Sequence, residues 1–470
     1  MTRRADLIVL GGGPAGASAA LAAAAEGLDV VLLDEAEAPG GQVFRAPPAS
    51  FVLAKRSHDQ AEGDALRAAV AASRVEWRGG RRVWSVGDRF RVDAVGPDGN
   101  EACEAPRLIV ATGAHERVVP FPGWTLPGVI GLAGATILLK SQGMAPADRL
   151  VVAGCGPLLL AVAAKSIAAG AQVAAIVDLA GPADWLRTVG PLLSRPAVAR
   201  EGAGWVASIA LKRVPVLFRH AILRAEGGDM LERAVAVPVD THGRPVLGGR
   251  ERIIETGCLA VGHGLVPGAE ATRLLRAQHR FDRLRGGWVP VTDAAGRTSI
   301  AGLYAIGDGA GIAGAAPALL NGRIAGLAAA SDAGRTAAAS GELLAERQRA
   351  MAFADAMAGM MALRPGQVAA IAPDTVVCRC EDVTRAEIEQ AVADGAREVN
   401  QLKHFTRCGM GPCQGRMCGD VAGELVARHV GGREAAGFWT GRPPLRPVPL
   451  DAMLGSFEYS DILVPNPAPL

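Results

Sequence analysis

The sequence lacks any long uninterrupted run of apolar residues. Each apolar stretch meets a glycine, a proline or a charged residue before it reaches the ~18 residues of a membrane span. It also lacks an excess of charge of either sign, since 49 Lys and Arg face 47 Asp and Glu without a long basic run. We therefore expect no membrane span and no nucleic-acid partner. With 50% hydrophobic and 20% charged residues, the 470-residue chain is expected to fold into two or three globular domains.

Cysteine is scarce over most of the chain. There are eight cysteines in all, and five of them fall between residues 378 and 418. The N-terminal R-R-A-D-L-I-V-L and its alanine stretch have features of a secretory signal, but removing them would cut away the glycine-rich turn described next. We therefore expect a cytoplasmic protein, in which clustered thiols indicate metal or redox chemistry rather than structural disulfides.

Residues 6–35 have the pattern of a strand, a glycine-rich turn, an Ala-rich helix and a second strand that ends in acid. The first glycine permits the tight turn, the second lets the backbone approach a pyrophosphate, and the third lets the helix pack closely on the strand. The helix N-terminus favours the diphosphate, and the acid is placed to accept hydrogen bonds from a ribose. The predicted dinucleotide-binding residues are Gly11, Gly13, Pro14, Ala15, Gly16 and Asp34, with Glu35 as the second choice of acid.

A second unit of this kind begins at residue 149. Gly154 and Gly156 are present, but Leu159 stands where the third glycine is expected, and Asp178 ends the second strand. Such an acid favours NAD over NADP because a carboxylate repels a 2′-phosphate. The leucine pushes the helix away from the strand and narrows the phosphate cradle. Two interpretations stay open, a nicotinamide-nucleotide site and a purely structural unit.

Three further segments carry a resemblance to a known family. They are A-P-G-G-Q-V (38–43), A-T-G-A-H-E-R (111–117) and the late motif around A-I-G-D-G-A-G (305–311). In combination they resemble the two-dinucleotide-binding flavoproteins, which include thioredoxin reductase and ferredoxin–NAD reductases. The resemblance implies FAD in the first unit, with an NAD-type domain inserted after the A-T-G strand. The residues that it adds to the FAD site are Gly41, Gln42, Thr112, Gly113, Gly307 and Asp308.

The redox-active C-x-x-C of disulfide reductases is missing from the regions where that family carries it. Those regions read P-G-G-Q-V-F-R and G-L-A-G-A-T-I-L-L-K. Cys103 and Cys258 are isolated in the sequence and are expected to be small buried residues. The chain is therefore not predicted to be a disulfide reductase.

The cysteine-rich segment combines C-R-C-E (378–381) with T-R-C-G-M-G-P-C-Q-G-R-M-C (406–418). The C-x-C pair is too close for a common zinc knuckle, whereas four thiolates from two loops suit an iron–sulfur cluster. Between the loops, Thr384 and Glu387 predict a helix with a capping box. The segment resembles the bacterioferritin-associated-ferredoxin-like [2Fe–2S] module. That resemblance implies Cys378 and Cys380 as ligands, with a second pair to be chosen from Cys408, Cys413 and Cys418. We predict Cys413 and Cys418, because related modules carry an apolar residue in place of Cys408, and it stays open whether Cys408 binds iron or only lies beside it. Zinc in the same four thiolates is the alternative metal.

The order of these parts resembles the larger flavoprotein subunit of the opine oxidase, hydrogen cyanide synthase and hydroxyproline/proline dehydrogenase complexes. The expected fold is α/β, with an FAD domain, an inserted NAD-like Rossmann domain and a small α-rich [2Fe–2S] module. The expected boundaries are 1–122 and 251–345 for the FAD domain, 123–250 for the insert, 346–372 for a helical linker, 373–430 for the module and 431–470 for a Pro-rich tail.

The resemblance implies an electron-transfer subunit of an amine or amino-acid dehydrogenase. A smaller FAD-containing, oxidase-like subunit would oxidise the C–N bond, and a small ferredoxin-like subunit would be a further partner. This chain would pass electrons toward a respiratory acceptor, which makes attachment at the inner membrane face an alternative to a free cytoplasmic location. Two other functions stay open: a self-sufficient NADH-dependent reductase and a metal scaffold with a vestigial flavin part.

Overall fold

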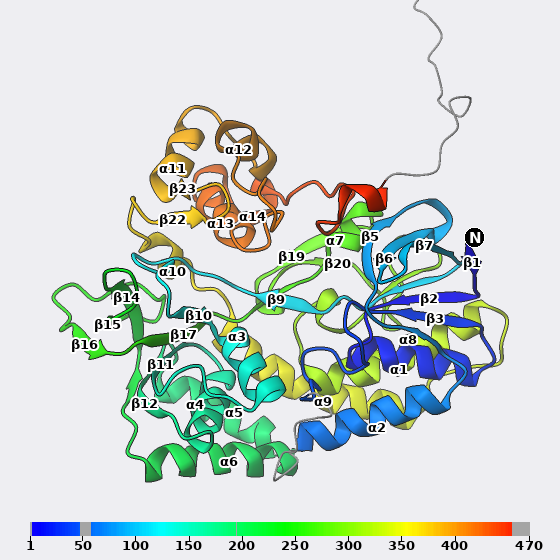
Figure 1. Cartoon of the computed structure of the whole chain (residues 1–470), viewed down its shortest axis with the longest axis horizontal. Helices are drawn as coiled ribbons and strands as arrows, with labels where there is room; N and C mark the ends of the chain where they lie inside the picture. Colours follow the sequence, from blue (N-terminus) through cyan, green and yellow to red (C-terminus); the bar gives the residue numbers. More distant parts are fainter. Residues whose placement is uncertain (1, 48–57, 194, 454–470) are drawn as a thin grey trace, which may run out of the picture.

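The first dinucleotide-type domain is built on a five-stranded parallel sheet in the order β21-β8-β2-β3-β4. Strands β2 and β3 of this sheet are labelled in Figure 1. The computed structural model describes residues 2–47, 58–193 and 195–453. The three central strands are almost wholly apolar and buried, as expected for a parallel sheet covered on both faces. The strands are β2 Leu7–Leu10, β3 Val30–Leu33, β4 Glu76–Arg78, β8 Leu108–Val110 and β21 Leu303–Ala305.

Helices α1 (Pro14–Ala25) and α8 (Ala315–Asp332) pack against each other with their backbones in contact. A Cβ on Gly322 would lie 2.1 Å from the carbonyl oxygen of Ala15, and one on Gly326 would lie 2.3 Å from that of Ala19. The paired positions increase together along both helices, so the helices are parallel. Their N-termini therefore lie at the same end of the domain.

The same domain carries a smaller sheet in the order β1-β7-β6-β5 and the helix α2 (His58–Ala72). The strands are β1 Arg3–Arg4, β5 Arg82–Val86, β6 Val92–Gly96 and β7 Gly99–Glu104, with the short turn η1 (Asp88–Phe90) between β5 and β6. Cys103 is buried in this region, next to the main sheet.

Two antiparallel strands, β9 (Ala114–Glu116) and β18 (Leu265–Pro267), link the first domain to the inserted one. The inserted parallel sheet has the order β10-β17-β11-β12-β13. Its strands are β10 Val129–Gly131, β11 Arg149–Gly154, β12 Gln172–Asp178, β13 Val216–Phe218 and β17 Cys258–Gly262. Strand β17 lies beyond residue 250, where the sequence placed the end of the insert, and pairs with β10 and β11.

The helices of the insert are α3 (Leu132–Ile137), which runs into the π-helical turn η2 (Leu138–Gln142), and α4 (Leu158–Ala168), α5 (Pro182–Leu193) and α6 (Pro196–Leu211). A separate antiparallel sheet is formed by β14 (His220–Glu226), β15 (Arg233–Pro238) and β16 (Arg252–Glu255). After β18 the chain returns to the first domain through α7 (Glu270–Leu274), β19 (His279–Asp282), η3 (Arg283–Arg285), β20 (Gly287–Pro290) and η4 (Gly307–Ala310).

The long helix α9 (Gly341–Met361) leads from the first domain to the C-terminal helical module (Figure 1). The module contains α10 (Pro365–Ala369), β22 (Val376–Cys378), β23 (Val383–Thr384), α11 (Arg385–Ala393), α12 (Val399–Thr406), α13 (Gly419–Val430) and α14 (Arg433–Ala436). The predicted capping box is confirmed, because Thr384 and Glu387 exchange side-chain and backbone hydrogen bonds at the start of α11.

The Pro-rich segment after the module packs on its own chain. Leu445 is buried in the core of the first domain, and its backbone N–H donates to the carbonyl oxygen of Trp84 at 2.6 Å. Gln414 and Arg416 of the module donate to the carbonyl oxygens of Pro444 and Leu445. The turn η5 (Leu450–Met453) follows. This segment therefore straps the module to the first domain. Across the described ranges 2–47, 58–193 and 195–453, no helix combines the length and apolar character needed to cross a membrane.

Candidate functional site

The first glycine turn presents an open backbone face at the N-terminus of α1. A Cβ on Gly13 would meet only the Cα of Gly41, at 3.9 Å. By contrast, a Cβ on Gly16 would lie 1.8 Å from the carbonyl oxygen of Gly11, so the helix packs against the turn as closely as its backbone allows. Gly13 is the N-cap residue and no side chain caps the helix, which leaves the first backbone N–H groups free to bind an anion. Pro14 and Ala15, also predicted here, are buried in the first turn of α1.

Asp34 faces this turn and Glu35 faces away from it. The Oδ2 atom of Asp34 accepts a hydrogen bond from the N–H of Gly12 at 2.5 Å, and Oδ1 accepts one from the N–H of Ala36 at 2.7 Å. Burial raises the pKa of Asp34 above its ordinary value, and the two backbone donors oppose that shift. Glu35 is exposed and pairs with Arg82 at 2.9 Å. Of the two acids, Asp34 is the one placed to receive a ribose hydroxyl.

The opposite wall is formed where α8 begins. The Oδ1 atom of Asp308 accepts hydrogen bonds from the N–H groups of Ala313 and Gly314, both at 2.9 Å. Gly307 has φ +64°, and a Cβ there would lie 2.8 Å from the Cβ of Ala15, which brings the late motif against α1. The Oγ1 atom of Thr112 donates to the carbonyl oxygen of Gly268 at 2.5 Å.

Of the remaining predicted FAD-site residues, Gly113 and Gly41 lie against the glycine-rich segments of the site, and Gln42 lies at the surface. A Cβ on Gly309 would contact Thr112 and Gly113 at 3.3 Å, so the A-T-G strand end meets the late motif. A Cβ on Gly41 would lie 2.8 Å from the Cα of Gly13. The side chain of Gln42, however, is exposed and accepts a hydrogen bond from Arg45.

These residues fit an FAD. Two parallel helices, α1 and α8, begin at the same end of the domain, with α8 starting about two turns ahead of α1 because Gly322 packs on Ala15, and neither has a side-chain cap. The open glycine Gly13 lies at the start of α1. The carboxylate of Asp34, directly after β3, has lone pairs left to accept further hydrogen bonds. This is the donor set that a pyrophosphate and a ribose require.

The second glycine turn is covered by the end of α9. A Cβ on Gly156 would lie 2.9 Å from Cγ and 3.2 Å from Sδ of Met361, and Gly156 itself is buried. A Cβ on Gly154 would lie 1.7 Å from the carbonyl oxygen of Gly262, so that glycine packs against β17. Leu159 is fully buried in the core of the insert. The backbone that should approach a pyrophosphate is therefore in contact with a methionine.

Asp178, the acid of the second unit, is engaged in the same way. Its Oδ2 accepts a hydrogen bond from Nε1 of Trp185 at 2.8 Å, and its Oδ1 accepts one from the N–H of Ala180 at 2.9 Å. Only 2% of Asp178 is exposed, and burial raises its pKa to about 6. Met357 and Met360 of α9 pack with Ala180 and Trp185 over this edge. Met361 thus contacts the glycine, and Trp185 the acid, that a nucleotide would need, and the second unit in this form does not fit NAD.

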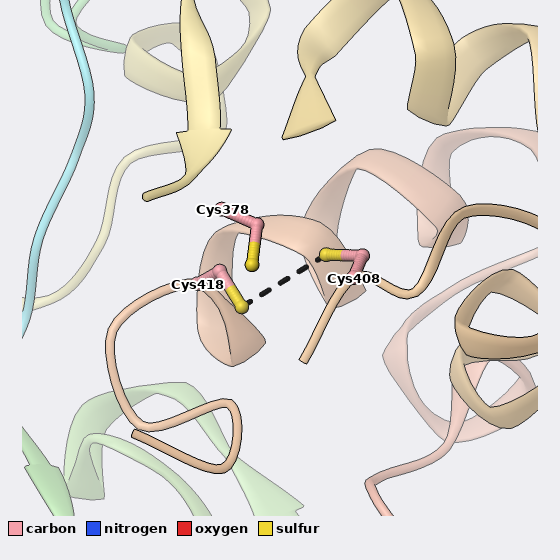
Figure 2. Close-up of side chains that lie close together, drawn as sticks. All are labelled: Cys378, Cys408 and Cys418. Atoms are coloured by element: carbon pink, nitrogen blue, oxygen red, sulfur yellow. Dashed lines mark hydrogen bonds between the residues drawn. The ribbon is translucent and has the colours of Figure 1, made fainter. Parts of the chain in front are cut away.

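Three of the five clustered thiols meet inside the C-terminal module (Figure 2). Cys378 ends β22, Cys408 follows α12 and Cys418 precedes α13. Their sulfur atoms lie within 4.8 Å of one another, and the sulfurs of Cys408 and Cys418 are 3.9 Å apart. None of the three residues is more than 1% exposed. We call Cys378, Cys408 and Cys418 the inner thiols.

Cys380 and Cys413, the outer thiols, are partly exposed and face each other. The sulfur of Cys380 interacts with the backbone N–H and the thiol of Cys413. The loops that carry them are in close contact, because a Cβ on Gly411 would lie 2.2 Å from the Cβ of Cys380. Four or more thiolates from two loops form a donor set suited to a [2Fe–2S] cluster or to a single soft metal ion.

Comparison with known proteins decides the family. Residues 5–334 match the family model "Pyridine nucleotide-disulphide oxidoreductase", and residues 372–456 match "Sarcosine oxidase A3 domain". An opine oxidase subunit of Agrobacterium tumefaciens (strain Ach5) is 35% identical, with 95% of this chain and 90% of the relative covered. Hydrogen cyanide synthase subunit HcnB of Pseudomonas aeruginosa is 34% identical, with 95% and 97% covered.

The chain belongs to the family of these opine oxidase and HcnB subunits. Its larger part is a pyridine nucleotide-disulphide oxidoreductase domain, so this family member is a flavoprotein oxidoreductase, and its relatives are subunits of multi-subunit enzymes. The crystal structure of L-proline dehydrogenase from P. horikoshii shares the fold, with a TM-score of 0.69 at 18% identity over 97% of this chain and 81% of that one.

In this family member, two ion pairs join the thiol module to the rest of the chain, and the first of them is buried. Arg117, directly after β9, pairs with Asp420 at 2.7 Å, and these side chains are 3% and 10% exposed. Arg283 pairs with Glu424 at 2.9 Å. Arg433 closes the network by pairing with Asp420 at 3.2 Å and with Glu424 at 3.7 Å.

The sequence interpretation did not single out these charged residues. Asp420 lies two residues after Cys418 and Arg117 ends the A-T-G-A-H-E-R motif, so both are next to predicted site residues in sequence. That proximity was the available signal. The network fixes the position of the thiols relative to the flavin domain, because a buried charge that loses its partner is strongly destabilising.

Proposed function

We propose that this chain is the FAD- and [2Fe–2S]-containing electron-transfer subunit of a multi-subunit amine or amino-acid dehydrogenase. The complex would oxidise a C–N bond of an opine-, proline- or glycine-type substrate and pass the electrons to a respiratory acceptor. One chain combines an open dinucleotide turn with a cluster of buried thiols, and the buried Arg117–Asp420 ion pair holds the thiol module against the chain of the flavin domain. This combination carries the proposal.

Each part has a defined task in this proposal. When bound, FAD supplies two-electron chemistry and a [2Fe–2S] cluster supplies one-electron transfer. The N-terminus of α1 holds the pyrophosphate, the N-terminus of α8 faces the flavin ring, and Asp34 orients the ribose. Cys378, Cys380, Cys413 and Cys418 hold the cluster. Arg117 and Asp420 hold the module against the flavin domain.

The bond-breaking step is assigned to a partner. Among the described residues we identify no acid–base pair or activated nucleophile in the flavin site. The names of the relatives describe subunits, one of opine oxidase and the other, HcnB, of hydrogen cyanide synthase. We propose that C–N oxidation takes place in a smaller FAD-containing, oxidase-like subunit, and that a small ferredoxin-like subunit is a further partner. A cytoplasmic complex at the inner membrane face would then reach a respiratory acceptor.

The rival function, a self-sufficient NADH-dependent reductase, requires an open second unit. The contact between Met361 and Gly156 and the hydrogen bond from Trp185 to Asp178 both argue against it. The third function, a metal scaffold with a vestigial flavin part, is disfavoured by the open face of Gly13.

The test is an anaerobic purification of the full chain followed by cofactor analysis and mixing with NADH. We expect FAD, iron and acid-labile sulfide in the purified chain, a flavin that photoreduction bleaches, and no bleaching by NADH. Flavin-free protein would support the scaffold function instead. Rapid bleaching of the flavin by NADH would contradict the proposed electron-transfer role and favour the NADH-dependent reductase. Zinc without sulfide would contradict the [2Fe–2S] assignment.

A further inference from the structure

The inner thiols outnumber the places available to them if the proposed [2Fe–2S] cluster is correct. Such a cluster takes four thiolates, two on each iron. The outer pair, Cys380 and Cys413, faces one side of the site and can bind one iron. The inner thiols Cys378, Cys408 and Cys418 then compete for the two places on the other iron.

The spacing of the inner sulfurs suits metal ligands. With metal–sulfur bonds of about 2.3 Å, the edge of a tetrahedral thiolate site is roughly 3.8 Å. The sulfurs of Cys408 and Cys418 are 3.9 Å apart, and Cys378 lies within 4.8 Å of both. Either Cys408 or Cys418 can therefore complete the inner side of the site with Cys378.

Helix ends distinguish Cys408 from Cys418. Cys418 is the N-cap residue of the twelve-residue helix α13, the end at which the helix dipole favours a thiolate. Cys408 lies two residues beyond Thr406, the last residue of α12, where the dipole has the opposite sign. Cys418 is accordingly the better resident ligand, and Cys408 is the weaker competitor.

The loop of Cys408 holds this thiol in place beside the site. Arg407 has φ +62°, a left-handed conformation that is unfavourable for a non-glycine residue. Its Nε atom donates to Oε2 of Glu381 at 2.7 Å, which ties the loop to the C-x-C segment. The N–H of Cys408 donates to Oγ1 of Thr406 at 3.2 Å. These two hydrogen bonds fix the loop that carries the buried thiol of Cys408.

We propose that Cys408 is a reserve ligand, which binds the inner iron in place of Cys418. This inference rests on the proposed [2Fe–2S] function. In the exchange one iron–sulfur bond breaks and another forms, and the proton of the Cys408 thiol passes to the departing Cys418 thiolate 3.9 Å away. Iron and sulfide keep their oxidation states, so the exchange needs no oxidant or reductant.

The test compares Cys408→Ala, Cys418→Ala and the double variant in the full chain, purified without oxygen. Alanine is used because a serine oxygen can itself bind iron. Cys258→Ala is the matched control, since Cys258 is a buried thiol in the core of the inserted domain. The readouts are iron and sulfide per chain, visible circular dichroism, the EPR spectrum of the reduced protein, and FAD content as the measure of folding.

We expect Cys408→Ala to match the wild type in iron and in EPR spectrum. Cys418→Ala should keep most of its iron with a shifted EPR spectrum, and the double variant should lose at least about tenfold in iron relative to Cys418→Ala. Equal iron loss in Cys418→Ala and the double variant would overturn the proposal. Loss in Cys408→Ala with retention in Cys418→Ala would also overturn it, by making Cys408 the resident ligand. Absence of sulfide in the wild type would instead overturn the proposed function.

Discussion

In the first dinucleotide-type unit, the second glycine of the turn is Gly13. A Cβ placed on it would meet only the Cα of Gly41, at 3.9 Å, so its backbone remains open. In the second unit, the equivalent Gly156 lies against Met361, and Asp178 is bonded to Trp185. The two units have the same order of strand, turn and helix, so the local motif does not decide whether a nucleotide can bind. Side chains from elsewhere in the chain decide it.

The comparison also suggests what the second unit does instead. Met361 is the last residue of α9, and the helical module begins directly after it. Arg117 donates both to the carbonyl oxygen of Met361 and to Asp420 of the module. Arg364, just beyond, donates to the carbonyl oxygen of Leu179 at 2.7 Å. The glycine turn and the residue after β12 thus anchor the segment that leads to the thiols.

The largest predicted effect comes from filling the open turn. Gly13→Val should weaken FAD binding by about 1,000-fold without disturbing the apoprotein, because Gly13 has φ −68° and a Cβ there finds free space. Gly156→Val is the matched variant. It should leave FAD content unchanged and lower stability by about 1–3 kcal/mol, because Gly156 has φ +86° and faces Met361. Flavin content and thermal unfolding of both variants check this contrast. Loss of FAD from Gly156→Val would contradict the prediction that only the first turn binds the cofactor.

The next effect is a pH dependence in the second unit. The folded pKa of Asp178 is about 6, above its ordinary value of 3.8, so the folded state binds the carboxyl proton more tightly than the unfolded state. Local stability should therefore be greatest at acidic pH and fall by up to about 3 kcal/mol as the pH rises from about 4 to above 6. Asp178→Asn should flatten this fall.

Hydrogen exchange of the amides of β11 and β12, measured across this pH range, checks the prediction. Asp229→Asn, at an exposed position of the same domain, is the control and should keep the wild-type fall. A flat wild-type profile would mean that the carboxylate is solvated, as a working nucleotide site would need.

Much of this arrangement was predictable from sequence. Both strand–turn–helix units, the long helix before the thiols and the capping box of Thr384 and Glu387 follow from local patterns. The covering of Gly156 by Met361 did not, because a methionine far along the chain carries no local signal of what it touches. Spacing likewise could not tell that Cys408 lies with Cys378 and Cys418, since it does not fix where a loop aims its side chains.

Local sequence patterns also could not predict where the inserted domain ends. The apolar strand β17, Cys258–Gly262, fits a buried position in either parallel sheet, so its pattern could not assign it to the insert. Pairing with β10 and β11 is a long-range choice. The Arg117–Asp420 pair is equally long-range, since its partners come together only when the module docks.

A smaller effect is expected from the methionine that covers the second turn. Met361→Ala should lower the local stability of β11 and α4 by about 2 kcal/mol, since it removes a side chain that packs on Gly156, and should leave FAD content unchanged. Met230→Ala is the control, because Met230 is 61% exposed. Hydrogen exchange of the turn amides measures the difference. Equal exchange in the two variants would show that Met361 does not cover the turn.

The smallest predicted effect concerns the hydrogen bond between Trp185 and Asp178. Trp185→Phe keeps the ring packing with Met357 and Met360 but removes the Nε1 donor to Asp178. The loss should cost about 1 kcal/mol of local stability at neutral pH and raise the pKa of Asp178 further, because that hydrogen bond stabilises the carboxylate. In Asp178→Asn the same tryptophan change should cost less, since the partner is no longer charged. A double-mutant cycle followed by hydrogen exchange measures this coupling, and strict additivity would show that Trp185 does not hold the acid of the second unit.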